Sequence, residues 1–226
     1  MKVVSVNIGL PQKIRFNNQL VTTSIFKTPV HEKIKLSKLN LQGDAQSDLS
    51  VHGGVDKAVY LYPAEHYDYW RKVYPEIEMD FGMFGENLTT QGLHEGSVYI
   101  GDTYTIGSSQ LVVTQPRMPC YKLGIRFGKM DIIEKFLNSL RSGIYFRVVR
   151  EGELKEGDEI KLLSRDNNNV SINDIVKLYK KKKYNHSELK LLERTLELKF
   201  LPENWKRHFE QKIYEAKKKT KFQNKL

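Results

Sequence analysis

The sequence predicts a mainly β fold with added helices, followed by a small helical extension. Two observations predict this fold. Residues 1 to about 163 contain many short apolar segments separated by Gly-Asp and other turn signals, a pattern typical of a barrel or a sandwich. After the polar residues 164–169, the apolar residues take a helical spacing instead. We therefore expect residues 1–165 to form one domain and residues 166–226 a three-helix extension.

Short apolar segments mark the expected strands, which lie at residues 2–7, 21–25, 34–36, 58–62, 104–106, 111–114, 144–150 and 159–163. Gly107-Ser108-Ser109 separates two of them and predicts a hairpin. Residues 144–150 and 159–163 flank further glycine turns, so we expect these two strands to pair.

The expected helices cover residues 63–74, 131–140, 171–182, 187–198 and 202–218. Pro63 suits the first turn of a helix, where its missing N–H costs nothing. Ser171 precedes Asp174 by three residues, which resembles a reciprocal capping arrangement. The last three helices make up the extension.

Bulk composition narrows the function classes. The chain of 226 residues has one cysteine, which excludes an internal disulfide and a four-cysteine cluster. No apolar run approaches the roughly 20 residues that span a bilayer, and the N-terminus does not look like a secretory signal. We expect a cytoplasmic protein with no membrane partner.

The positive charge lies mainly in the extension. The net charge is +10, and residues 166–226 carry 16 basic and 8 acidic side chains. Lysines beside Tyr179 and Tyr184 could contact phosphates and stack bases, or dock an acidic electron donor. A solvated helix end is the favoured interpretation, and we expect no nucleic-acid partner.

Residues 51–58, with the sequence Val-His-Gly-Gly-Val-Asp-Lys-Ala, form the first possible binding site. Gly53 and Gly54 allow close approach of a ligand to backbone N–H groups, which can bind an anion. Lys57 adds a positive charge, and His52 and Asp56 add directional hydrogen bonds. On composition alone, a hairpin turn that carries polar side chains is the favoured interpretation.

Cys120 ends a second motif, in which two prolines stiffen the chain and Arg117 lies three residues earlier. A nearby guanidinium favours thiolate, the nucleophilic and metal-binding form. A lone cysteine is more often a small buried hydrophobe. Lys27 lies in the segment 26–30 and Asn87 in the segment 84–88. Neither segment indicates a binding site by itself.

The order of these motifs carries more information than any one of them. Phe26-Lys27-Thr28-Pro29-Val30, Gly43-Asp44 with the His-Gly-Gly segment, Phe84-Gly85-Glu86-Asn87-Leu88 and Pro116-Arg117-Met118-Pro119-Cys120 follow one another. Together they resemble the MOSC family, and its YiiM-type branch in particular. The segment 143–148 followed by Gly157-Asp158 also resembles that branch. The resemblance covers about residues 1–165, and the extension is similar to the three helices that accompany this branch.

The resemblance implies a β-barrel-like MOSC domain that binds the molybdenum cofactor. Cys120 is then the catalytic residue and the ligand of molybdenum, since thiolate is a soft ligand. Lys27 and Lys57 are expected to hold the pterin phosphate with Arg117 in support. The backbones of Gly53 and Gly54, and the side chains of His52, Asp56 and Asn87, complete the expected cofactor-binding set. The resemblance leaves open what Arg147 faces.

The implied activity is the reduction of N-hydroxylated compounds such as hydroxylaminopurines, hydroxylamines and amidoximes, a detoxification reaction. The chain has no glycine-rich dinucleotide fingerprint and too few cysteines for an iron–sulfur cluster. Electrons are therefore expected from a separate protein of the flavoprotein or ferredoxin type.

Two other functions remain open at this point. Cys120 could bear a persulfide or hold the cofactor for delivery, without turnover. Cys120 and His52 could also pair in space as a thiol hydrolase. A complete sulfurase is not expected, because no pyridoxal-phosphate domain accompanies these motifs.

Overall fold

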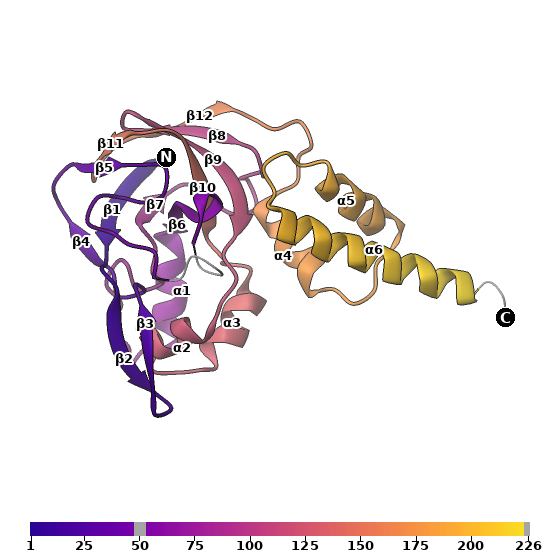
Figure 1. Ribbon diagram of the computed structural model, residues 1–226, viewed down its shortest axis with the longest axis horizontal. Coiled ribbons are helices and arrows are strands. Elements are labelled where there is room, and N and C mark those ends of the chain that lie inside the picture. Colours follow the sequence, from indigo (N-terminus) through magenta and orange to yellow (C-terminus); the bar gives the residue numbers. More distant parts are fainter. Residues whose placement is uncertain (48–52, 224–226) are drawn as a thin grey trace.

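A large mixed sheet with helices on one side and a helical extension at one end makes up the protein (Figure 1). The computed structural model describes residues 1–47 and 53–223, with side chains as far as residue 218. Its strands are β1 (Lys2–Ile8), β2 (Gln12–Phe16), β3 (Gln19–Thr23), β4 (Thr28–Val30), β5 (Ile34–Leu36), β6 (Val59–Pro63), β7 (Leu88–Gln91), β8 (Thr103–Ile106), β9 (Ser109–Pro116), β10 (Ile144–Arg150), β11 (Gly152–Leu154) and β12 (Ile160–Ser164). The prediction of a mainly β fold with added helices is confirmed.

The large sheet has the strand order β12-β8-β9-β10-β6-β7-β1-β4. Its neighbours are antiparallel except β6 and β7, which run parallel. Backbone hydrogen bonds join the start of β1 to the approach to β12: Val3 N donates to Asp158 O (2.9 Å), and Ile160 N donates to Met1 O (2.8 Å). These bonds curl the sheet into a barrel-like shape.

The predicted pairing of residues 144–150 with 159–163 is wrong. Strand β10 lies between β9 and β6, whereas β12 pairs with β8. The residues between them explain the difference, because β11 forms a separate small sheet with β5 and leads the chain away from β10.

Strand β10 shows how the barrel positions side chains for a site. Ile144, Phe146 and Val148 are buried in the main core. Successive side chains of a strand point to opposite faces, so Tyr145 and Arg147 face the other way. That face looks toward the short 3-10 helix η1 (Val55–Lys57).

A second, largely aromatic core lies under helices α1 (Glu65–Val73), α2 (Tyr121–Phe127) and α3 (Ile132–Ser139). Tyr62 stacks on Phe84 with ring centroids 4.2 Å apart, and Trp70 Nε1 donates to the Tyr62 hydroxyl (2.7 Å). Pro63 is the last residue of β6, and α1 begins two residues later at Glu65. The predicted start of this helix at Pro63 is therefore wrong by two residues.

The extension contains the three predicted helices, α4 (Ile172–Lys180), α5 (His186–Leu196) and α6 (Glu203–Gln223). Ser171 and Asp174 form the predicted capping box at α4. Backbone bonds tie the chain on either side of Ser171 to the barrel: Ile100 N donates to Val170 O (2.9 Å), and Ile172 N donates to Val98 O (3.0 Å). The division at residue 165 stays a prediction. In residues 1–47 and 53–223, no helix has the length and apolarity needed to span a membrane.

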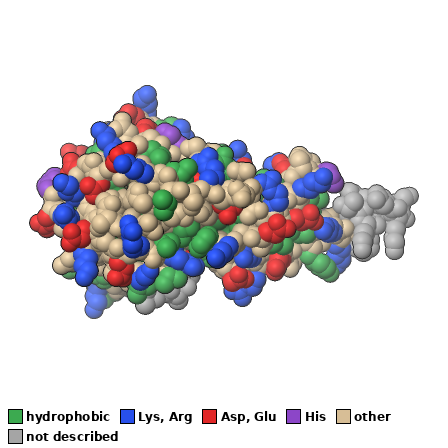
Figure 2. Space-filling view, turned by 90° about the horizontal axis from the view of Figure 1, so that it is seen from above, with side chains coloured by type: hydrophobic (Ala, Val, Ile, Leu, Met, Phe, Trp, Pro, Cys, Tyr) green, Lys and Arg blue, Asp and Glu red, His purple; other side chains and the backbone are tan. Residues whose placement is uncertain are grey.

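Charges on the extension are mixed in sign. Figure 2 shows basic and acidic side chains interspersed over this end of the molecule. Lys181 forms an ion pair with Glu188, and Lys217 Nζ lies 2.7 Å from Glu193 Oε1. Both pairs lie within the extension, so its net charge of +8 is unchanged by them.

Candidate functional site

A cavity on one side of the barrel brings five of the predicted site residues together. Lys27, Lys57, Asn87, Arg117 and Cys120 all line it. Two barrel strands and the separate β2–β3 hairpin position many of these residues, because residues 24–27 follow β3, Tyr60 lies on β6 and residues 117–120 follow β9.

Cys120 stands where β9 gives way to α2. Pro116 ends the strand, and Cys120 occupies the N-cap position of the helix with an extended backbone (φ −135°, ψ 171°). Its carbonyl accepts a hydrogen bond from Leu123 N (2.9 Å), and its side chain is partly exposed. The only thiol of the chain is therefore held at a fixed place in the cavity wall, in reach of a ligand.

The cavity is strongly basic. Lys27, Lys57, Arg117 and Lys122 line it, whereas Asp44 carries the one carboxylate among the described lining residues. Lys122 was not predicted, although it is buried two residues after Cys120 at the start of α2. An excess of three positive charges in a confined space favours an anionic ligand.

Asp44 organises one wall of the cavity. Its carboxylate pairs with Lys27 and accepts hydrogen bonds from Gly9 N (2.8 Å) and Asn87 Nδ2 (2.8 Å). Burial lowers the pKa of Lys27, and the Asp44 carboxylate opposes that shift. Asn87 Oδ1 in turn accepts from Tyr60 N (3.1 Å). The amide of Asn87, predicted to read a ligand, thus already bridges Asp44 and β6.

Two buried polar atoms of cavity residues have no hydrogen-bond partner among the described residues: Arg117 Nη1 and Ser24 Oγ. The Arg117 guanidinium lies over the rings of Tyr60 and Phe136, 5.4 and 5.3 Å from their centroids. Leaving buried polar atoms unpaired is costly. Such atoms in a cavity wall mark places where a ligand can bind.

In the Gly-Gly segment, Asp56 and Gly54 make contacts within the protein. Asp56 binds Arg147, whose Nε donates to its Oδ1 (2.7 Å), so Asp56 is engaged within the protein. Gly54 has φ +95°, which favours glycine, and its N–H donates to the side chain of Gln46 (2.8 Å). Gly53 is partly exposed beside it. His52 lies outside the described residues.

Arg147 connects the barrel to the extension. Besides its bond with Asp56, its guanidinium lies 6.0 Å from the ring centroid of Phe200, in the loop between α5 and α6. Thr114 Oγ1 donates to the carbonyl of Asp56 (2.7 Å), so η1 is also fixed to β9. Arg147 therefore supports the segment that carries Lys57.

Comparison with known proteins identifies the family. The family model for the MOSC domain matches residues 48–161. The uncharacterized protein YflK of Bacillus subtilis (strain 168) is 37% identical over 210 residues, covering 93% of each chain. The chain belongs to the MOSC family. The crystal structure of YiiM from Geobacillus stearothermophilus superposes with a TM-score of 0.78 and 32% identity, over 94% of this chain and 98% of that one. The predicted YiiM-type resemblance is confirmed.

A further relative is named for an activity. A protein of Gibberella moniliformis (strain M3125 / FGSC 7600), named "Reductase", is 36% identical over 148 residues, which are 64% of this chain and 26% of that protein. Membership of the MOSC family associates the chain with molybdenum-cofactor chemistry.

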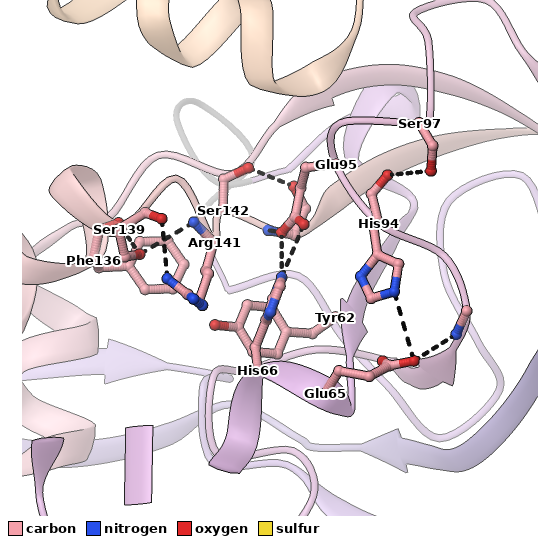
Figure 3. Close-up of polar contacts among 12 residues, drawn as sticks. Tyr62, Glu65, His66, His94, Glu95, Ser97, Phe136, Ser139, Arg141 and Ser142 are labelled. Carbon is pink, nitrogen blue, oxygen red and sulfur yellow. Dashed lines mark hydrogen bonds and ion pairs between the residues drawn. The ribbon is translucent and has the colours of Figure 1, made fainter. Parts of the chain in front are cut away.

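The turn that starts β10, the strand of the cavity residue Tyr145, depends on Glu95. Figure 3 shows the imidazole of His66, from α1, directed at the Glu95 carboxylate. His66 Nε2 lies 2.8 Å from Glu95 Oε2, and Gly143 N donates to Glu95 Oε1 (2.8 Å). The neighbouring Ser142 carbonyl accepts from the Tyr60 hydroxyl (3.0 Å). Glu95 thus fixes the turn that starts β10.

Replacing Glu95 with alanine is expected to lower the free energy of unfolding by about 2–3 kcal/mol, because a buried N–H and an imidazole lose a charged acceptor. The melting temperature should fall by about 5–10 °C. Glu65→Ala is the matched control, since this carboxylate also accepts from a backbone N–H (Gly92 N, 2.8 Å) and lies 3.8 Å from His94, but is partly exposed (Figure 3). Its loss should cost no more than about 1 kcal/mol. Equal effects of the two changes would contradict the assignment.

Proposed function

We propose that this protein is a molybdenum-cofactor-dependent reductase of N-hydroxylated compounds, such as hydroxylaminopurines, hydroxylamines and amidoximes. The observation that carries the proposal is the position of Cys120 in a cavity with four cationic side chains and one carboxylate. Family membership and the relative named "Reductase" support the same class of activity.

The cavity residues fit the cofactor, which combines a metal that binds sulfur with an anionic phosphate. The Cys120 thiolate is the soft donor suited to molybdenum. Lys27, Lys57, Lys122 and Arg117 suit the phosphate, and the unpaired Arg117 Nη1 offers a buried donor to an anion. Ser24 Oγ offers a second hydrogen-bonding atom to the polar edge of the pterin.

The overall reaction takes R–NHOH, two electrons and two protons to R–NH2 and water. The cofactor, when bound, supplies the two-electron redox chemistry. In this proposal, Cys120 anchors the metal, the basic side chains orient the phosphate end, and the barrel wall from Tyr60 to Arg117 restricts access of water. The electrons come from a separate flavoprotein or ferredoxin-type partner.

The test is the molybdenum content, measured by mass spectrometry, of wild type and Cys120→Ala produced in a host that makes the cofactor. We expect near-stoichiometric metal in wild type and loss in the variant. Tyr121→Ala, which changes the exposed next residue, should keep the metal. Equal metal in wild type and Cys120→Ala, or none in wild type, would refute the proposal.

A second assay separates turnover from carriage. Metal-loaded wild type should convert a hydroxylamine to its amine with reduced methyl viologen as the artificial electron donor. Metal without turnover would instead identify a carrier that uses Cys120 to hold the cofactor.

A further inference from the structure

A second hollow lies between the barrel and the extension, on the other side of Cys120. The barrel contributes Lys57, Gln115, Pro116, Met118, Pro119, Cys120 and Tyr145, and the helices contribute Tyr179, Asn204, Trp205 and His208. Lys57, Met118, Cys120 and Tyr145 also line the basic cavity. Cys120 therefore stands at the boundary between two hollows.

Two helices present the aromatic wall of the second hollow. Tyr179 lies near the end of α4, and Trp205 and His208 lie three residues apart in the first turns of α6, hence on one face. The Tyr179 ring centroid is 5.6 Å from that of Trp205 and 5.1 Å from that of His208. Trp205 Nε1 donates to Gln115 Oε1 (2.9 Å), which fastens α6 to β9.

The chemistry of the second hollow differs from that of the first. Lys57 carries the one permanent charge among its described lining residues, which also include the imidazole of His208. Burial lowers the pKa of His208, the Lys212 ammonium lowers it further, and Glu215 acts in the opposite sense. Near neutral pH, the imidazole thus offers one donor and one acceptor nitrogen. Aromatic faces with a few hydrogen-bonding groups suit a flat, uncharged heteroaromatic ring.

We propose that this hollow is the substrate subsite, in which Tyr179 stacks on a flat heteroaromatic ring while His208 and Asn204 bind the polar edge of the ring. The ring then lies against the extension, and its N-hydroxyl group reaches the boundary at Cys120. The reduction of the N-hydroxyl group rests on the proposed function, whereas the binding of the ring does not. The subsite thus assigns recognition of the ring to Tyr179, Asn204 and His208 of the extension.

The test is the binding of adenine, a flat purine that cannot be reduced at an N–O bond, to the full chain by isothermal titration calorimetry. Tyr179→Leu should weaken binding at least tenfold, since stacking on one aromatic side chain is worth about 1–3 kcal/mol. His208→Gln should weaken it about threefold or more, since one hydrogen bond is worth about 0.5–1.5 kcal/mol. Tyr214→Leu is the matched control, because this α6 tyrosine is 64% exposed. It should bind adenine as wild type does. Cyclohexanol, which is uncharged but not flat, should not bind.

The outcomes separate this inference from the proposed function. Undiminished adenine binding by folded Tyr179→Leu and His208→Gln, checked by circular dichroism and melting temperature, would overturn the subsite even if Cys120 anchors metal. The absence of adenine binding to wild type would also overturn it. Binding weakened by these factors in the two variants would support the subsite even if wild type contained no molybdenum.

Discussion

Replacing Asp44 with alanine is expected to lower the free energy of unfolding by about 3–5 kcal/mol at pH 7, because Lys27 would remain buried without its counter-charge. Gly9 N and Asn87 Nδ2 would lose their acceptor at the same time. Chemical denaturation measures the loss. Asp68→Ala, which removes a largely exposed carboxylate, should change stability by less than about 0.5 kcal/mol.

The pH dependence separates the ionic effect from lost hydrogen bonds. Burial lowers the folded-state pKa of Lys27 below its unfolded value, and without Asp44 nothing comparable opposes the shift. Between those two pKa values the unfolded chain binds more protons, so stability rises with pH there. Asp44→Ala should therefore be less destabilised at pH 9.5 than at pH 7. Adding Lys27→Met should restore at least about 1 kcal/mol at pH 7. A pH-independent loss would contradict this account.

Replacing Arg117 with methionine is expected to weaken the binding of inorganic phosphate to the cofactor-free protein at least tenfold. The buried guanidinium offers Nη1, an unpaired donor, to an anion in the cavity. Ligand at 100 times its dissociation constant stabilises a folded protein by about 2.7 kcal/mol. Wild type should therefore melt about 5–10 °C higher in saturating phosphate, and a tenfold weaker site loses about 1.4 kcal/mol of this stabilisation.

Chloride at equal ionic strength controls for salt, and Arg150→Met controls for loss of a positive charge, since Arg150 is exposed at the end of β10. Arg150→Met should keep the wild-type phosphate response. An Arg117→Met protein with the full response would show that the other cations bind the anion without this guanidinium.

Local patterns predicted much of the secondary structure. Alternating apolar residues gave β10 its bounds, and the capping residues Ser171 and Asp174 marked the start of α4. Helix α2 was missed because its seven residues span barely two turns. Strand β2 was missed although Asn17 and Asn18, both with positive φ, form the turn of its hairpin with β3. Asn-Asn between two alternating segments was the available signal.

Most contacts between side chains far apart in the sequence could not be predicted. The motifs predicted that Lys27, Lys57, Arg117 and Cys120 share a site, and the cavity contains all four. Nothing local indicated that Asp56 would bind Arg147, 91 residues away. The burial of Lys122 and the role of Asp44 likewise depend on the closed barrel. The cofactor contacts themselves stay predictions.

The hydrogen bonds between residues 1–3 and residues 157–160 constrain when this protein can fold. A chain leaving the ribosome cannot close the barrel until residue 160 has emerged. Residues 6–8 of β1 can pair early with β4, whereas residues 1–3 wait through most of translation with that edge unpaired. Exposed edges of that kind invite aggregation. Helices α4 to α6 follow β12 in the chain, so all the strands are made before the helices that pack on them. Closure of the barrel during synthesis therefore requires that at least residues 1–160 have been made.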